Sequence, residues 1–308
     1  MPEIIKVDGL CKTFGKLQAV NNLSFSVNEG DVYGFLGQNG AGKSTTIRML
    51  LTLIAPTSGT IELFGKSLSS HRKEILSQIG AMIERPDLYK YLSAYDNLKL
   101  FAKLSGCKVT NQLLMNQLEM VGLAERANDK VKGFSQGMKQ RLGIAIALVH
   151  NPALVILDEP TNGLDPQGIA DIRNLIKSLS TDHKKTVVVS SHLLNEIEQV
   201  ASRILIIDKG KKIIEGTTQE LLDPNQTVVD IETNDKKNAY ALLSSSSWAN
   251  HLQKLINDKI SLTLNKHQIP DLLRTLVEMN IDVYALQQRH SLEDYFLKVT
   301  SGNYVQPV

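Results

Sequence analysis

A glycine-rich segment near the N-terminus contains the residue types that bind phosphate. The segment reads Gly37-Gln38-Asn39-Gly40-Ala41-Gly42-Lys43-Ser44, and Thr45 follows it. Glycines let consecutive backbone N–H groups surround a phosphate, and the N-terminus of a following helix attracts the anion. Lys43 can reach the β- and γ-phosphate oxygens, and the Ser44 hydroxyl can ligate Mg²⁺. The segment therefore predicts binding of a nucleoside triphosphate with Mg²⁺; a plain glycine turn between a strand and a helix is the alternative.

Two adjacent acids later in the chain supply groups that hydrolysis needs. Asp158 and Glu159 follow the apolar run 154–157. Ligands of open α/β sheets bind at the carboxyl ends of the strands. Asp158 is therefore predicted to hold Mg²⁺ through its water shell, and Glu159 to polarise the attacking water as general base. By themselves two such acids are more often a helix cap or a solvated loop, but the glycine-rich segment favours the catalytic interpretation.

The elements around these residues follow an alternating order up to about residue 220. Short apolar runs alternate with longer helical patterns, which is typical of a sheet with parallel strands and helices packed on it. The clearest runs are nearly all apolar, as central strands covered on both faces are, and they span 32–36, 154–157, 186–189 and 204–207. Between about residues 85 and 151 the order changes, and helices are predicted at 94–104, 111–121 and 136–148. We interpret this part as a helical subdomain within an α/β domain of residues 1–220.

Residues 221–308 follow a different pattern. Strands are predicted at 227–232, 252–256, 260–264 and 281–286, and helices at 235–243, at 270–279 and from Ser291 onward, with a hairpin turn at 257–259. The order β-α-β-β-α-β predicts a small accessory α+β domain of the ferredoxin-like type. The serine run 244–247 is interpreted as a loop of this domain rather than as an interdomain linker.

Between the two phosphate-chemistry motifs lies Phe134-Ser135-Gln136-Gly137-Met138, and here the sequence resembles the nucleotide-binding subunit of ATP-binding cassette (ABC) transporters. The resemblance covers nearly all of residues 3–220. It includes Gly163-Leu164-Asp165, similar to the D-loop of the family, and His192 after two serines, similar to its switch histidine. It implies an α/β P-loop NTPase fold, a RecA-like core with a helical subdomain, and ATP and Mg²⁺ as cofactors.

The resemblance also implies that two subunits, identical or different, pair head to tail. Ser135, Gln136 and Gly137 would then meet the γ-phosphate bound by the opposite chain, and Asp165 would lie at the dimer seam. His192 would contact the γ-phosphate and help to hold the water. Phe14 stands where the family places an aromatic ring under adenine, although an aromatic residue in an early strand is more often part of the core.

Two positions depart from the usual pattern of the family. The signature has Gln136 and Met138 where the family usually has Gly and Gln, and Glu84 stands where the family usually has Gln. That residue normally approaches Mg²⁺ and the attacking water, so Glu84 is a candidate catalytic residue and metal ligand; a plain loop acid is the alternative. Both departures resemble the branch of bacterial exporters associated with bacitracin resistance and lantibiotic immunity.

Composition limits the partners. The chain has 34 Lys and Arg against 32 Asp and Glu, a net charge of +2 that gives no general argument for binding nucleic acid. Two cysteines are too few for a disulfide scaffold and favour a reduced compartment. The N-terminus lacks a secretory signal, and no apolar stretch reaches the roughly 18–20 residues that span a bilayer. We therefore expect a cytoplasmic protein, peripheral on the cytoplasmic face, that contacts the membrane only through permease subunits.

Three functions are open to such a chain. The leading hypothesis is an ATPase subunit that powers solute export, with residues 86–95 receiving a coupling helix of the permease; Leu88, Tyr89, Tyr91 and Leu92 would be interface or core there. The alternative is a non-transport ABC ATPase that clamps DNA or ribosomes, but the chain has neither a long coiled coil nor a second cassette. A third hypothesis makes residues 221–308 a ligand sensor, and an accessory or dimer-stabilising role is favoured over it.

Overall fold

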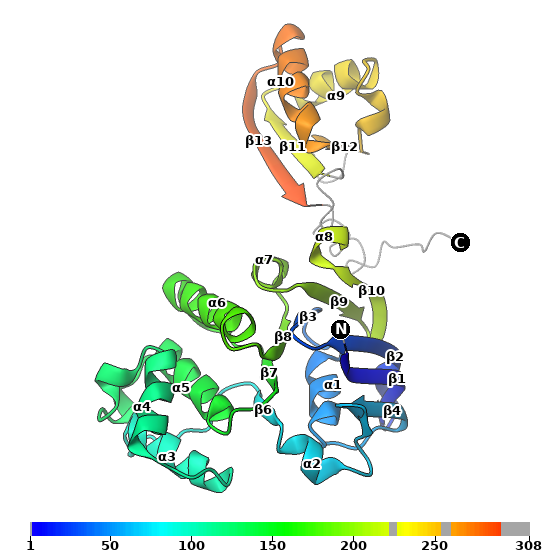
Figure 1. Cartoon of the computed structure of the whole chain (residues 1–308). Helices are drawn as coiled ribbons and strands as arrows, with labels where there is room; N and C mark the ends of the chain where they lie inside the picture. The colour runs from blue at the N-terminus through cyan, green and yellow to red at the C-terminus, as the bar shows by residue number, and fades with distance from the viewer. Residues whose placement is uncertain (1, 222–226, 254–259, 291–308) are drawn as a thin grey trace. The chain divides into compact units, whose positions relative to one another are not determined.

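The computed structural model describes residues 2–221, 227–253 and 260–290, and the chain divides into two compact units (Figure 1). The N-terminal unit comprises Met1–Thr217 and the C-terminal unit Thr218–Val308. No helix among the described residues is long and apolar enough to cross a membrane.

The six-stranded sheet of the N-terminal unit positions the predicted phosphate chemistry. Its order is β10-β9-β3-β8-β7-β6 among the described residues, and all neighbours are parallel except the edge pair β10 and β9. The strands are β3 (Val32–Leu36), β6 (Ile79–Met82), β7 (Leu154–Asp158), β8 (Thr186–Ser191), β9 (Arg203–Asp208) and β10 (Lys211–Thr217). The four predicted central strands are confirmed as β3, β7, β8 and β9, and β3, β7 and β8 are buried along their whole length.

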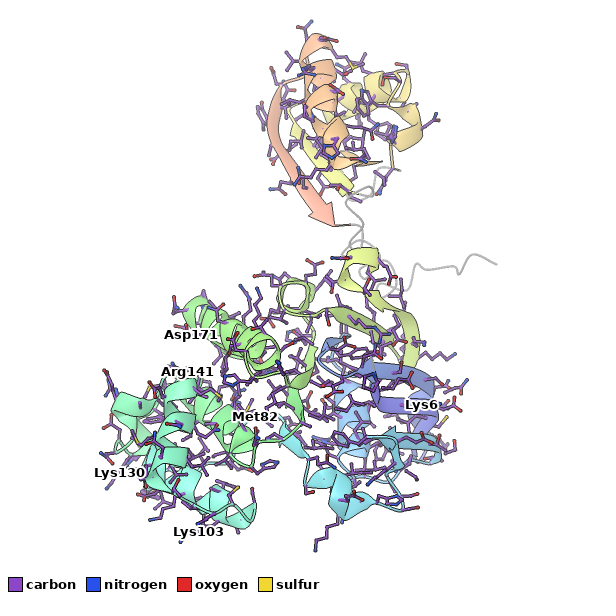
Figure 2. All side chains as sticks on the ribbon, viewed as in Figure 1. Lys6, Met82, Lys103, Lys130, Arg141 and Asp171 are labelled. Atoms are coloured by element: carbon purple, nitrogen blue, oxygen red, sulfur yellow. The ribbon has the colours of Figure 1, made fainter. Side chains whose placement is uncertain are left out.

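A second sheet was not predicted. It is antiparallel, with the order β2-β1-β4-β5, and consists of β1 (Glu3–Phe14), β2 (Leu17–Asn28), β4 (Ser58–Leu63) and β5 (Lys66–Ser67). Leu23, Phe25 and Val27 of β2 are buried and alternate with more exposed residues, a period-two signal that the sequence does contain. The helix α1 (Lys43–Leu50) packs against strands of both sheets, so one hydrophobic core joins them. Figure 2 draws the side chains, with Lys6 of β1 and Met82 of β6 labelled.

The helices follow the predicted order. The helical part contains α3 (Ala94–Leu104), α4 (Asn111–Met120) and α5 (Gln136–Leu148), which contact one another and confirm the three predicted helices. Short 3-10 helices at Ala124–Arg126 and Val131–Gly133 lie between α4 and α5. Outside this part lie α2 (Arg72–Leu76), α6 (Pro166–Thr181) and α7 (Leu194–Glu198), of which α6 and α7 both contact β8.

The C-terminal unit has an antiparallel sheet with the order β12-β11-β13 within the described residues. Its elements are α8 (Thr218–Leu221), β11 (Thr227–Thr233), α9 (Lys236–Ser244), β12 (Ile260–Leu264), α10 (Ile269–Glu278) and β13 (Val283–His290), with 3-10 helices at Ala249–His251 and Lys266–Gln268. Residues of α9 and α10 share one core with residues of the strands, among them Val229 of β11 and Leu262 of β12.

The predicted strand that begins at Leu252 falls within the described residues only at its first two positions. Leu252 forms an isolated antiparallel bridge to Leu262 of β12, and the Gln253 N–H donates to the Ser261 carbonyl at 2.8 Å. The rest of that strand, the predicted turn at 257–259 and the helix from Ser291 lie outside the described residues. The serine run is not a linker: Ser244 ends α9, and the hydroxyls of Ser245 and Ser246 donate to carbonyls of α9.

Candidate functional site

The glycine-rich segment forms a loop from the end of β3 to the start of α1. Gly40 and Gly42 have φ angles of 84° and 107°, a left-handed region that favours glycine. A Cβ atom on Gly42 would lie 2.6 Å from the Ala19 carbonyl oxygen, so only glycine fits. Gly42 is also the N-cap of α1, and no side chain caps this helix N-terminus. The first N–H groups of α1 therefore face the loop without a side-chain acceptor, as an anion site requires.

Lys43 is buried at the centre of this loop. Its Nζ atom donates to the carbonyl oxygens of Gly37 and Gln38, at 2.6 and 3.3 Å, and lies 3.1 Å from Glu159 Oε1. The loop thus surrounds a positive charge that already has a carboxylate beside it. This is the charge arrangement that stabilises phosphate oxygens next to a general base.

Asp158 and Glu159 are positioned by the pairing of β7 with β8. Asp158 lies opposite Ser190 in the parallel register, and the Ser190 hydroxyl donates to Asp158 Oδ1 at 2.5 Å while accepting from the Glu159 N–H at 2.9 Å. Asp158 is fully buried, and its Oδ2 atom has no hydrogen-bond partner in the structure. A buried carboxylate oxygen left unpaired is costly, and a cation offsets that cost.

Glu159 links the loop to the predicted switch histidine. Its Oε2 atom lies 2.8 Å from His192 Nδ1, while Oε1 faces Lys43. The backbone of Glu159 has a φ angle of 50°, which is uncommon for a residue with a side chain and is typical of functional sites. Strand pairing, the Ser190 bond and the contacts with Lys43 and His192 therefore fix the orientation of this carboxylate.

A cavity of about 460 Å³, which we call the carboxylate cavity, opens in front of these groups. Its lining residues include Ser44, Glu84, Gln140, Asp158, Glu159 and Asn162. The Ser44 hydroxyl and the unpaired Asp158 oxygen are hard oxygen donors of the kind that Mg²⁺ prefers. The described residues contain no group of three or more His, Cys, Asp or Glu that could hold a metal, and Mg²⁺ sites at phosphates need only one or two carboxylates. The residues present fit Mg²⁺.

Glu84 faces the same cavity, two residues after the end of β6. Its φ angle is 56°, and its Oε1 atom accepts from Arg48 Nη2 at 2.5 Å. The sequence interpretation missed Arg48, although its position four residues after Ser44 places both on one face of α1. It also missed Gln140, which is buried on α5 with an unpaired Oε1 atom and for which we find no signal in the sequence.

A neighbouring cleft of about 270 Å³ joins the loop to Phe14. It is lined by the loop residues Gln38, Asn39, Gly40, Gly42, Lys43, Ser44 and Thr45, and by Phe14 and Glu159. Gly37 and Ala41 do not line it; Ala41 is buried, and the Gly37 N–H donates to the Ser191 carbonyl. The Phe14 ring is 48% exposed, with Lys12 Nζ 5.0 Å from its centroid. The ring is therefore not part of the core, the alternative that the sequence had left open.

The signature and D-loop residues lie elsewhere. Ser135 is the N-cap of α5 and accepts from the Met138 N–H, and Asp165 is the N-cap of α6 and accepts from the Gly168 N–H. Both are exposed, and Gln136 and Gly137 are half-buried. None of these residues lines the carboxylate cavity or the Phe14 cleft. Within one chain the structure does not bring them to the phosphate loop.

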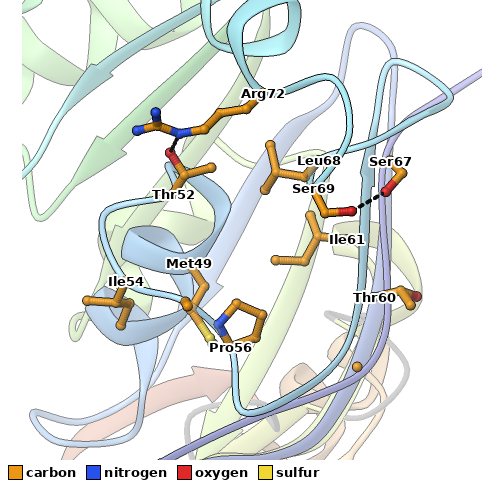
Figure 3. A pocket seen from close by; sticks show the side chains of 12 residues that line it. Met49, Thr52, Ile54, Pro56, Thr60, Ile61, Ser67, Leu68, Ser69 and Arg72 are labelled. Carbon is orange, nitrogen blue, oxygen red and sulfur yellow. Dashed lines mark hydrogen bonds between the residues drawn. The ribbon is translucent and has the colours of Figure 1, made fainter.

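A further pocket, with mainly apolar lining residues, lies apart from this site. It measures about 320 Å³ and lies at the C-terminal end of α1, between Met49, Ile61 and Leu68, with Arg72 at its edge donating to the Thr52 hydroxyl at 2.7 Å (Figure 3). It shares no lining residue with the carboxylate cavity or the Phe14 cleft.

Comparison with known proteins gives a consistent result. A family model described as ABC transporter matches residues 20–162, within the N-terminal unit. The bacitracin transport ATP-binding protein BcrA of Bacillus licheniformis is 43% identical over 303 residues, which cover 98% of this chain and 99% of that protein. The lantibiotic transport ATP-binding protein SrtF of Streptococcus pyogenes is 45% identical over 212 residues, or 69% of this chain and 90% of that protein. The BcrA alignment therefore extends through both units.

Solved structures agree with the fold of the N-terminal unit. The ATP-binding cassette MJ0796, a dimer in a post-hydrolysis state with ADP and Pi, is 27% identical with a TM-score of 0.63, covering 70% of this chain and 98% of that chain. The cbiO1 protein of Clostridium perfringens, part of the complex cbiONQ, is 26% identical with a TM-score of 0.65, covering 71% and 90%.

Proposed function

The chain belongs to the ABC transporter family as an ATP-binding subunit, and on that premise we propose that it hydrolyses ATP to power export of a solute through separate membrane-spanning subunits. The observation that carries the proposal is the Glu159 carboxylate, held between Lys43 Nζ and His192 Nδ1 beside the unpaired Asp158 oxygen. The names of the relatives point to bacitracin and lantibiotics, so we propose a peptide antibiotic as the class of cargo. Nothing in the site favours a clamp on DNA or ribosomes.

Each residue of the site has a role in this proposal. The loop N–H groups and Lys43 bind the β- and γ-phosphates, with Phe14 stacked on the adenine. Ser44 and Asp158, with Glu84 beside them, hold Mg²⁺, which when bound neutralises charge on the phosphate oxygens. Glu159 accepts a proton from the attacking water, and His192 orients Glu159 through the Nδ1 contact.

A second subunit completes the site. Ser135, Gln136 and Gly137 of the opposite chain, at the start of a helix, supply N–H groups and a hydroxyl to the γ-phosphate, and Asp165 lies at the seam. The exposure of these residues and their absence from both cavities of the described chain support a partner there.

The permease docks on the loop before α3. Tyr89 and Tyr91 are 56% and 78% exposed, and Leu92 is also exposed, so these residues are interface candidates rather than core. The buried Asn97 fixes this loop: its Oδ1 atom accepts from the Tyr89 N–H, and its Nδ2 atom donates to the Tyr89 and Ser93 carbonyls. A preformed aromatic surface of this kind suits a helix of a permease on the cytoplasmic face of the membrane.

The substitution Glu159→Gln tests the proposed function. Gln keeps the shape of the side chain but cannot accept the proton of the attacking water, so we expect phosphate release to fall by about 10²–10⁴-fold while ATP binding persists. Phosphate release and binding of a fluorescent ATP analogue would be measured on the full chain, with light scattering to detect a trapped dimer. Lys43→Ala is the contrasting control, since it should weaken nucleotide binding itself. Full turnover by the Glu159→Gln protein would rule out this role.

A further inference from the structure

Glu196 of α7 forms hydrogen bonds on both sides of the catalytic pair without touching either member. Its Oε2 atom accepts from the Thr161 hydroxyl at 2.6 Å and from the Ser191 hydroxyl at 3.0 Å. Glu196 is 9% exposed and Ser191 is 2% exposed, so neither bond competes strongly with solvent. Thr161 is two residues after Glu159, and Ser191 directly precedes His192. One carboxylate oxygen thus joins the segment that contains the general base to the segment that contains the switch histidine.

The local backbone makes this link stiff. The Asn162 N–H donates to the Glu159 carbonyl and the Leu164 N–H to the Thr161 carbonyl, so Thr161 sits inside a tight turn that leads to Asp165. On the other side, the Ser191 hydroxyl also accepts from the Leu193 N–H at 3.0 Å, which fixes the peptide groups on either side of His192. With the Glu159 to His192 contact, the bonds close a ring through Glu196.

We propose that Glu196 is a positioning residue for hydrolysis: by accepting from Thr161 and Ser191 it holds Glu159 and His192 in register and makes the turn toward Asp165 move together with the histidine loop. The proposal rests on the proposed function, in which Glu159 is the base. Glu196 touches neither the phosphate loop nor the carboxylate cavity, whose lining residues do not include it. Its loss should therefore slow the chemical step and leave nucleotide binding intact.

The test compares Glu196→Ala with Glu196→Gln in the full chain. Glu196→Ala removes the acceptor, and we expect kcat to fall by about 10–100-fold, as loss of a supporting contact typically does, with KM and ATP-analogue binding changed less than about twofold. Gln retains an oxygen acceptor in the same place, so Glu196→Gln should restore most of kcat. Asn195→Ala, an exposed neighbour on α7, is the matched control and should behave as wild type.

The two hydrogen bonds can also be removed one at a time, which keeps the test decisive if Glu196→Ala does not fold. Thr161→Val is nearly isosteric and deletes one bond, and Ser191→Ala deletes the other. Each should lower kcat with little change in KM. Adding Thr161→Val to Glu196→Ala should cause no further loss, because both remove the same bond.

Several outcomes would overturn the proposal. Wild-type kcat in Glu196→Ala would do so, and so would a parallel loss of kcat, nucleotide binding and thermal stability, which indicates a merely structural role. Equal defects in Glu196→Gln and Glu196→Ala would show that the charge of Glu196 matters, rather than its acceptor oxygen. Arg173, which lines a small cavity together with Glu196, would then be the candidate partner of that charge. Measuring Glu159→Gln alongside distinguishes failure of this inference from failure of the proposed function. If Glu159→Gln is inactive while Glu196→Ala has wild-type activity, only the inference about Glu196 fails. An active Glu159→Gln protein would rule out both proposals.

Discussion

At the scale of single residues, the carboxylate cavity brings several negatively charged side chains together. Asp158, Glu159, Glu84 and Asp87 all line it, with Arg85 as a cation in the same lining, and like charges that line one cavity repel one another. Lys43 faces Glu159, and Arg48 faces Glu84. Arg48 therefore offsets the negative charge of Glu84, and it holds that carboxylate at the edge of the cavity.

Replacing Arg48 with Met should expose this compensation. Arg48 and Glu84 are 41% and 63% exposed, so breaking the pair should change the free energy of unfolding by less than about 1 kcal/mol. The unpaired Glu84 should strengthen Mg²⁺ binding by about two- to fivefold, measured as the Mg²⁺ concentration that gives half-maximal ATPase and half-maximal binding of an ATP analogue. The double variant Arg48→Met with Glu84→Gln should return to the wild-type midpoint. An equal shift in the double variant would show that Glu84 is not responsible.

At the scale of elements, the helical part is tied to the central sheet just after α5. His150 follows the end of α5, and its Nε2 atom lies 3.1 Å from the Ile79 carbonyl of β6. Burial lowers the pKa of His150 below its usual value, against the opposing effect of this hydrogen bond. The neutral ring with the proton on Nε2 is therefore the form that fits between α5 and β6. The signature residues stand at the start of α5, and Glu84 follows the end of β6.

Stability should consequently depend on pH through His150. A depressed pKa means that the unfolded chain binds more protons than the folded one below about pH 6.5, so the contribution of this site is present above that pH and is lost as the pH falls. Urea unfolding followed from pH 8 to pH 5 should show this decline. His150→Gln, whose amide can still donate to the Ile79 carbonyl, should flatten it. A slope unaffected by His150→Gln would contradict the assignment.

At the scale of the whole molecule, the N-terminal unit carries the ATP site and an exposed aromatic surface on separate elements. Tyr91 is 78% exposed, and the loop that carries it is fixed by Asn97 rather than by the phosphate loop. The surface can therefore be changed without altering the ATP site. The C-terminal unit has its own core, and the alignment with BcrA extends through it.

Replacing Tyr91 with Ser should separate docking from hydrolysis. We expect ATPase activity of the isolated subunit to stay within about twofold of wild type, because Tyr91 touches neither cavity. Copurification with the coexpressed permease subunits should fall by about tenfold or more, as loss of a central aromatic anchor does. Lys90→Ser, at an adjacent exposed position, controls for surface changes in general. Undiminished copurification of the Tyr91→Ser protein would place the docking surface elsewhere.

Features whose chemistry is local could be predicted from the amino-acid sequence. The phosphate loop depends on glycine conformations and on a helix that begins directly after it, and the central strands and the helices depend on apolar runs and periodicity, so contiguous residues were sufficient. Period-two alternation in β2 was present in the sequence but missed.

The contacts that hold the site together could be identified only in the folded chain. Ser190 bonds to Asp158, His192 contacts Glu159, Glu84 pairs with Arg48, and Glu196 joins Thr161 to Ser191. Most of these partners are more than 30 residues apart in the chain, and no local pattern relates them. They meet because parallel pairing of β7 with β8 and β6 puts the carboxyl ends of the strands side by side, and because α1 and α7 pack against the same sheet.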